Sequence, residues 1–223
     1  MRISDLKKSY GNFSVHIENL LIPKGMICGL VGPNGCGKTT AMKMMAGVIK
    51  PDSGSIDYEG LRLDDITMAF RKPYLIRDTV YNNLVYPLKI RKIKPDKQLV
   101  DYFLEMAGLQ NLRSQYAPSL SGGEQQKLSL IRAFVFSPKI IFVDEAFSNM
   151  DIESVARFEE YILNMQKQTP ITWVIVSHQL SNIKRLCERV YFISNGKIKL
   201  SGSPSEIFSD PQDEDLMRYL KYV

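Results

Sequence analysis

Residues 32–39 have the sequence GPNGCGKT, an unbroken G-x-x-x-x-G-K-T pattern. The apolar run 26–31 before this loop predicts a short buried strand, and the spacing of apolar residues in 39–49 predicts a helix after it. Glycines let successive backbone N–H groups turn toward phosphate oxygens, and the following helix directs its positive end to the same place. This strand–loop–helix order predicts a phosphate-binding loop rather than a chance glycine-rich turn.

Two side chains of this loop have expected chemical roles. Lys38 would reach the β- and γ-phosphates of a bound nucleotide and act in catalysis, and the Thr39 hydroxyl would ligate Mg²⁺. The other residues of the loop that we expect to bind the nucleotide are Asn34, Gly35, Cys36, Gly37 and Thr40.

The composition limits the class of protein. The chain has 223 residues, 44% hydrophobic and 24% charged, which excludes a disordered, collagen-like or coiled-coil chain. Its formal net charge of +5 permits contact with phosphates or an anionic membrane face, but we expect no nucleic-acid partner. Three cysteines without a C-x-x-C pair predict neither a disulfide framework nor a zinc site. Since the sequence has no signal peptide and no apolar run of about 20 residues, we expect a soluble chain that a partner brings to any membrane.

Predicted strands and helices alternate along the chain. Apolar strands are expected at 140–143, 173–177 and 190–193, each beside a helix, and this alternation implies an α/β fold with a parallel sheet. Residues 73–130 are rich in predicted helix and interrupt the pattern. We interpret them as a helical subdomain inserted in an α/β core, so that residues 1–223 form one domain.

Two acids and a histidine follow predicted strands. Because the carboxyl ends of parallel strands form the ligand-binding edge of such a sheet, Asp144 is a candidate Mg²⁺ ligand and Glu145 a candidate general base for the attacking water. An acidic pair in isolation could equally be a solvated turn. His178 ends the strand 173–177 at the same edge, where a neutral imidazole could bridge the γ-phosphate and the water. A structural or exposed histidine is the alternative.

The segment 120–126, LSGGEQQ, begins like a second anion-binding turn at the head of a helix, although a serine with two glycines alone indicates only a loop and a helix cap. Together, GPNGCGKTT (32–40), LSGGEQQ, IIFVDE (140–145), SNMD (148–151) and VSH (176–178) resemble the ATP-binding-cassette (ABC) transporter ATPases over nearly the whole chain. The resemblance implies a P-loop NTPase core with a parallel sheet, a small antiparallel β subdomain and an inserted α-helical subdomain. It also implies ATP hydrolysis with Mg²⁺.

In this family two cassettes pair head to tail. The resemblance implies that Ser121, Gly122 and Gly123 of one copy touch the γ-phosphate held by the P-loop of another, which supplies part of the charge stabilisation. Tyr10 matches the aromatic residue that stacks on adenine, with a surface or core tyrosine as the alternative. Asp151 matches the acid that links the two sites, although the usual SALD is SNMD here.

One position departs from the family pattern. The family has a glutamine at the junction between core and helical subdomain, where it ligates Mg²⁺ and senses the membrane partner, but this chain has Arg71 there. No glutamine occurs between Thr40 and Lys97, so a shifted alignment does not supply one. Arginine cannot ligate a cation. Arg71 could contact the γ-phosphate as an extra positive charge, or swing outward and leave a water on the metal.

Residues 66–91 resemble the corresponding stretch of tungstate and related oxyanion importers. The resemblance implies the ATPase subunit of a prokaryotic importer, peripheral on the cytoplasmic side of the cell membrane. Its partners would be a second cassette, separate transmembrane permease subunits and a solute-binding protein. The alternatives are a cassette for another solute, including an exporter, and a soluble non-transport ABC ATPase. A P-loop kinase is a third class, against which LSGGEQQ argues.

Overall fold

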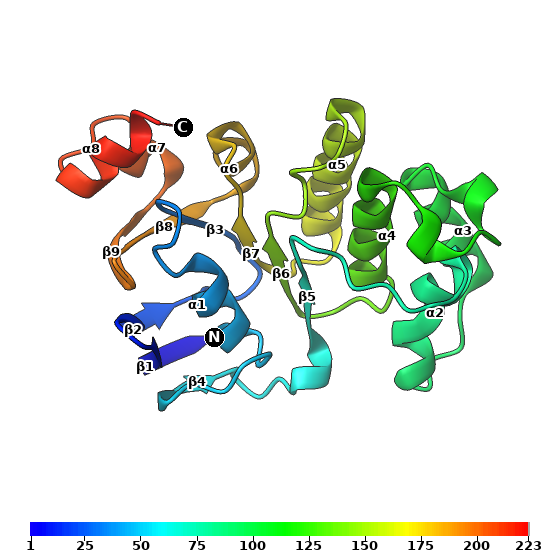
Figure 1. Ribbon diagram of the computed structural model, residues 1–223, viewed down its shortest axis with the longest axis horizontal. Coiled ribbons are helices and arrows are strands. Elements are labelled where there is room, and N and C mark those ends of the chain that lie inside the picture. The colour runs from blue at the N-terminus through cyan, green and yellow to red at the C-terminus, as the bar shows by residue number, and fades with distance from the viewer. Residues whose placement is uncertain (223) are drawn as a thin grey trace.

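The computed structural model describes residues 1–222 and contains two sheets (Figure 1). The larger has six strands in the order β5-β6-β7-β3-β8-β9, parallel throughout except for the antiparallel edge strand β9. The central strands are fully buried and apolar, as expected where helices cover both faces of a parallel sheet. The predicted α/β fold with a parallel sheet is therefore confirmed. Its strands are β3 (Ile27–Val31), β5 (Ile66–Ala69), β6 (Ile140–Asp144), β7 (Thr172–Val176), β8 (Arg189–Ser194) and β9 (Lys197–Gly202).

The smaller sheet is antiparallel, in the order β2-β1-β4, with strands β1 (Arg2–Tyr10), β2 (Phe13–Leu21) and β4 (Ser53–Asp57). Leu6 of β1 and Val15 of β2 are completely buried. They pack with Met42 of α1 (Lys38–Met45) in one of two hydrophobic cores. The small sheet thereby holds the first helix, and the loop before it, against the large sheet.

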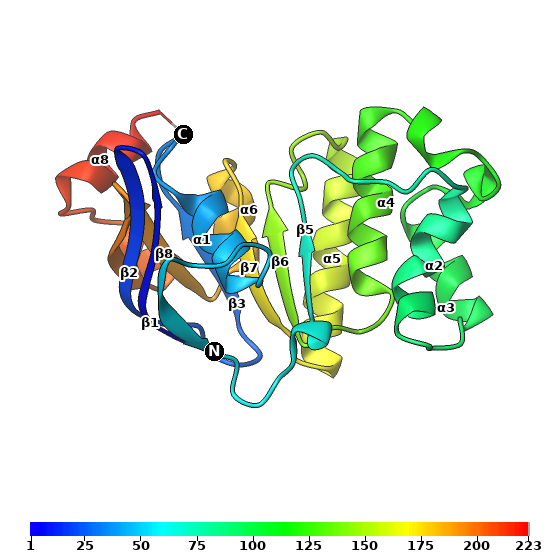
Figure 2. The ribbon, with the colours of Figure 1, turned by 60° about the horizontal axis from the view of Figure 1, so that its bottom comes forward.

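The other helices pack against the large sheet in the second hydrophobic core or lie at the edges of that core. Figures 1 and 2 place the small sheet at one end of the molecule and α2 and α3 at the other, with the large sheet between them. Of the helices described in residues 1–222, none is both long and apolar enough to cross a bilayer. They are α2 (Val80–Ile90), α3 (Lys97–Met106), α4 (Gly122–Phe134), α5 (Ile152–Gln168), α6 (Leu180–Leu186), α7 (Pro204–Phe208) and α8 (Glu214–Leu220), with 3₁₀ turns at Leu63–Asp65, Gln110–Leu112 and Ala117–Ser119.

An aromatic cluster joins the helical end of the molecule to the sheet. Phe134 of α4 stacks on Tyr161 of α5 and meets Trp173 of β7 edge to face, both with ring centroids 5.5 Å apart. Phe103 of α3 contacts Tyr161 at 5.6 Å. Aromatic pairs of this geometry add to the free energy gained by burial, so α3 and α4 are fixed to the large sheet through α5.

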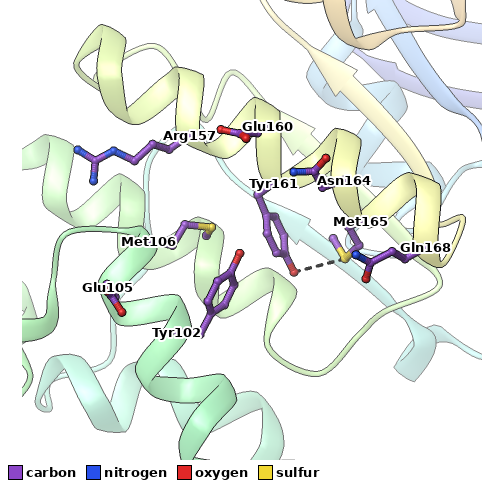
Figure 3. Close-up of a pocket in the computed structure, with 9 residues that line it drawn as sticks. All are labelled: Tyr102, Glu105, Met106, Arg157, Glu160, Tyr161, Asn164, Met165 and Gln168. Carbon is purple, nitrogen blue, oxygen red and sulfur yellow. Dashed lines mark hydrogen bonds between the residues drawn. The ribbon is translucent and has the colours of Figure 1, made fainter.

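A hollow of about 700 Å³ opens between α3 and α5 (Figure 3). Tyr102, Met106, Tyr161 and Met165 line it, with carboxylates of Glu105 and Glu160 at its rim. No residue of the predicted phosphate-binding loop borders this hollow. It is therefore separate from the candidate site described next.

Candidate nucleotide site

The P-loop, residues 32–39, connects the end of β3 to α1 and includes the first two residues of that helix, in the strand–loop–helix order that the sequence predicts. Two glycines are required by close packing. A Cβ on Gly32 would lie 2.1 Å from the carbonyl oxygen of Ile193, and one on Gly37, where φ is +108°, would lie 2.5 Å from Val15. The backbone of Gly35 faces open space. The loop is thus wedged between β8 and β2 on its outer side and open where a ligand would sit.

The predicted helix 39–49 is shorter in the structure, since α1 ends at Met45. Gly47 has φ +69°, a left-handed conformation that terminates helices, and its N–H donates to the carbonyl of Met44. The apolar spacing beyond Met45 belongs to a turn that still faces the core.

The Lys38 ammonium points into its own loop. Its Nζ donates hydrogen bonds to the carbonyl oxygens of Gly32 at 2.7 Å and Pro33 at 2.9 Å, and the residue is only 7% exposed. Cys36 lies beside it, with Sγ 4.0 Å from Nζ. Burial raises the pKa of the Cys36 thiol, although the positive charge of Lys38 opposes the rise. A lysine held within the glycine-rich loop is suited to binding phosphate oxygens.

The two predicted metal ligands meet at the sheet edge. The Thr39 hydroxyl donates to both carboxylate oxygens of Asp144, at 2.9 Å and 3.2 Å. Burial raises the pKa of Asp144 above its ordinary value, while the hydrogen bond from Thr39 acts in the opposite direction. A hydroxyl and a carboxylate are the hard oxygen donors that Mg²⁺ takes in proteins, so the pair fits the ion.

Glu145 directly follows β6 and adopts a left-handed conformation, with φ +51°. Its N–H donates to the Val176 carbonyl at 3.0 Å, and its own carbonyl accepts from the hydroxyl of Ser148 at 2.9 Å. The Glu145 carboxylate is 7% exposed and lies between two cationic or polar partners. His178 Nε2 is 2.6 Å from Oε1, and Arg71 Nε is 3.1 Å from Oε2. The structure therefore brings Arg71, Glu145 and His178 together from the ends of three strands.

Lys38, Thr39, Glu145, His178 and Arg71 border one cleft of about 330 Å³, and Asp144 is joined to it through its hydrogen bond with Thr39. The residues that line it are Phe13, Asn34, Gly35, Gly37, Lys38, Thr39, Thr40, Arg71, Glu145 and His178. Phe13 is the residue that the sequence analysis missed. Its place could have been predicted from the sequence, because Phe13 faces Tyr10 across the β1–β2 hairpin and so lies on the segment expected to hold adenine.

Tyr10 lies outside this lining. It ends β1, is 50% exposed, and has the Lys8 ammonium 5.9 Å from its ring centroid. An exposed ring at the rim remains available for stacking on a base, so the adenine role stays a prediction.

The predicted second half of the site lies on another part of the molecule. Ser121 caps α4 in a capping box with Glu124, and Gly122 faces open space. A Cβ on Gly123 would be 2.9 Å from the Asn149 carbonyl oxygen, so the small residue lets α4 approach the loop 148–151. None of these three residues borders the cleft of the same chain.

Asp151 has a structural role in addition to its predicted one. Its carboxylate caps α5, accepting bonds of 2.7 Å from both the N–H and the hydroxyl of Ser154. These bonds hold the pKa of Asp151 below its usual value. Lys127 of α4 lies 3.7 Å from the same carboxylate, which ties the start of α5 to the LSGGEQQ helix.

Comparison with known proteins identifies the family. The ABC transporter family model matches residues 15–148. The chain belongs to this family. It is 34% identical over 203 residues to the tungstate uptake ATP-binding protein TupC of Peptoclostridium acidaminophilum, covering 88% of this chain and 95% of that protein. It is 31% identical to a sulfate/thiosulfate import ATP-binding protein, CysA, of Mesostigma viride, covering 99% of this chain and 67% of that protein.

The fold of this ABC ATPase is also found among solved structures. A dimeric post-hydrolysis structure of the ATP-binding cassette MJ0796, bound to ADP and Pi, superposes with a TM-score of 0.79. The match covers 91% of this chain and 98% of that one at 24% identity. Family membership makes this chain an ATP-hydrolysing subunit, and the P-loop NTPase fold expected from the resemblance is confirmed.

Proposed function

We propose that this chain is the ATP-binding and hydrolysing subunit of an ABC importer, and that the importer carries tungstate or a related oxyanion. The observation that carries the ATPase part is the meeting of Lys38, Thr39, Glu145 and His178 at one cleft, with Asp144 hydrogen-bonded to Thr39. The solute part rests on kinship. The relative with 34% identity over almost its full length is named for tungstate, and the sulfate/thiosulfate relative handles another tetrahedral oxyanion.

The candidate residues in and around the cleft have separate roles in this proposal. The P-loop amides and Lys38 bind the β- and γ-phosphates, and Tyr10 stacks on the adenine. Thr39 and Asp144 hold Mg²⁺, which neutralises charge on the transferred phosphate when it is bound. Glu145 accepts a proton from the attacking water, and His178 orients Glu145 through their 2.6 Å contact.

Half of the charge stabilisation comes from a second copy. Ser121, Gly122 and Gly123 present N–H groups at the start of α4 but lie outside the cleft of their own chain. In a head-to-tail pair they close over the γ-phosphate bound by the other P-loop, with Asp151 linking the two sites. This arrangement makes ATP the ligand that joins the two cassettes.

The remaining partners belong to the transporter. We propose separate transmembrane permease subunits and a solute-binding protein, with this chain peripheral on the cytoplasmic side of the cell membrane. ATP-driven pairing of the cassettes would then power the movement of the solute.

The test is purification of the tagged chain from detergent-solubilised membranes of its source cells, followed by mass spectrometry of bound proteins. We expect a polytopic membrane protein in stoichiometric amount. A chain recovered without any membrane protein would contradict the transport role and favour a soluble cassette ATPase.

Solute identity needs a second measurement. Cellular tungsten uptake is compared, by elemental mass spectrometry, between cells with the wild-type chain and cells with Lys38→Ala. We expect uptake to fall to background in the variant, and an excess of sulfate to show whether the importer discriminates between oxyanions. Equal tungsten uptake in both cell lines would refute tungstate as the solute.

A further inference from the structure

Arg71 occupies a position from which it can reach two different anions. It lies two residues beyond β5 and borders the nucleotide cleft together with Lys38 and Thr39. Its side chain is 68% exposed, whereas that of its ion-pair partner Glu145 is 7% exposed. The guanidinium is therefore the mobile member of the pair and the carboxylate the fixed one.

Both oxygens of the Glu145 carboxylate have a nitrogen-bearing side chain beside them while Arg71 is in place. His178 contacts Oε1 at 2.6 Å, and Arg71 Nε lies 3.1 Å from Oε2. Among residues 1–222, no donor makes an aligned hydrogen bond to this buried Oε2, so Arg71 supplies charge there without good hydrogen-bond geometry. A general base needs a free lone pair directed at the water, and Oε2 is the oxygen that Arg71 covers.

The backbone next to Arg71 is hydrogen-bonded to α4, whereas its side chain is exposed. The carbonyl of Phe70 accepts a 3.0 Å hydrogen bond from Nε2 of Gln126, a fully buried residue of α4. The pivot of the Arg71 side chain is thus fixed to the helix that begins at Ser121.

Phosphate is the stronger ligand for a guanidinium in this cleft. The five N–H donors of arginine form paired bonds with phosphate oxygens, and the terminal phosphate of ATP carries more charge than one carboxylate. The Arg71–Glu145 pair is imperfectly aligned and open to solvent on the arginine side, so exchanging it for phosphate costs little.

We propose that Arg71 is a positioning residue that changes partner with the state of the cleft. It pairs with Oε2 of Glu145 when no nucleotide is bound, and it moves to the terminal phosphate of ATP, which frees Oε2 for the attacking water. This inference rests on the proposed ATPase site and adds a nucleotide-sensing role for a residue that cannot ligate Mg²⁺. ADP lacks the γ-phosphate that attracts Arg71, so it leaves the pair intact.

The move of Arg71 to the phosphate is tested by comparing the affinity of the chain for ATP with its affinity for ADP. Binding is measured by calorimetry in EDTA, because a glutamine at position 71 then has no metal to ligate. We expect Arg71→Gln to weaken ATP binding about tenfold and to change ADP binding by less than about twofold. Arg71→Lys should retain most of the ATP affinity. Lys72→Gln removes the neighbouring exposed charge and serves as the matched control.

The pairing of Arg71 with Glu145 in the nucleotide-free chain is tested by thermal unfolding. In the nucleotide-free chain, the effects of Arg71→Gln and Glu145→Gln on the melting temperature should be non-additive in the double variant, because each removes the same pair. Strict additivity would overturn the free-state pairing. Unchanged ATP affinity in Arg71→Gln, or equal losses for ATP and ADP, would overturn the transfer to the terminal phosphate.

These outcomes are distinct from a failure of the proposed function. A wild-type chain that binds neither nucleotide would count against the ATPase site as a whole. Normal wild-type binding together with an unaffected Arg71→Gln variant would overturn only the exchange.

Discussion

The Thr39 hydroxyl, at the start of α1, donates a 2.9 Å hydrogen bond to Oδ2 of Asp144 at the end of β6. This bond joins the helix that follows β3 to the end of β6, which lies two strands away from β3 in the sheet. It also brings together two hard oxygen donors that would hold Mg²⁺.

Thr39→Val removes this hydroxyl while keeping the shape of the side chain. We expect the Mg²⁺ concentration for half-maximal ATPase activity to rise at least about tenfold. The free energy of unfolding should fall by about 1 kcal/mol, because buried Asp144 loses a donor. Thr67→Val on β5 is the control, and a Mg²⁺ dependence equal to wild type in Thr39→Val would refute the ligand role.

Ser121 and Ser203 offer a matched pair, because each caps a helix in a capping box with a glutamate three residues later. Replacing either serine by alanine should lower stability by about 1 kcal/mol through loss of the cap. Only Ser121→Ala should also weaken ATP-dependent dimerisation, measured by light scattering in a Glu145→Gln background that binds ATP without turnover. Equal dimerisation in the two variants would mean that Ser121 is a helix cap alone.

The two histidines provide a second matched pair. His178 contacts Glu145 and His16 contacts Asp5, each with Nε2 2.6 Å from a carboxylate oxygen. We expect His178→Ala to reduce the ATPase rate constant by about 10²-fold or more, since it removes the group that orients the base. His16→Ala alters a pair on the small sheet and should leave the rate unchanged. Similar rates in both variants would remove His178 from the catalytic set.

The three cysteines should be unreactive in the native protein. Burial raises the pKa of Cys28 to about 12 and also raises the pKa values of Cys36 and Cys187. At pH 8 only about one Cys28 thiol in 10⁴ is then ionised, and the thiolate is the reactive form. We expect negligible labelling by a disulfide reagent at pH 8, a rate that increases with pH, and three labelled thiols in denaturant. Rapid native labelling at Cys36 would show that the P-loop opens to solvent.

Those parts of the site that depend on short-range sequence were predictable. The strand before Gly32, the P-loop and the start of α1 follow from local patterns, and the acids at 144–145 follow from one apolar strand. The pairing of Arg71 with Glu145 could not be predicted, because it depends on the exact direction of two side chains from different strands. The capping of α5 by Asp151 is a local pattern, an aspartate directly before a helix, and was predictable from the sequence on that ground.

The end of α1 illustrates a conflict between two local signals. The apolar spacing predicts a helix through residue 49, but Gly47 in a left-handed conformation ends it near Met45. The backbone conformation of Gly47 therefore decided the end of the helix, and of the apolar residues after it Val48 is exposed and Ile49 is half-buried.

The place of β3 in the sheet has a consequence for synthesis on the ribosome. Its two neighbours are β7 and β8. Ile27 pairs with Trp173 of β7, and Cys28 pairs with Arg189 of β8. The P-loop segment therefore leaves the exit tunnel long before either strand that will flank it exists. Until then an apolar strand with two unpaired edges is exposed, and the nascent chain should depend on shielding by chaperones for most of its elongation.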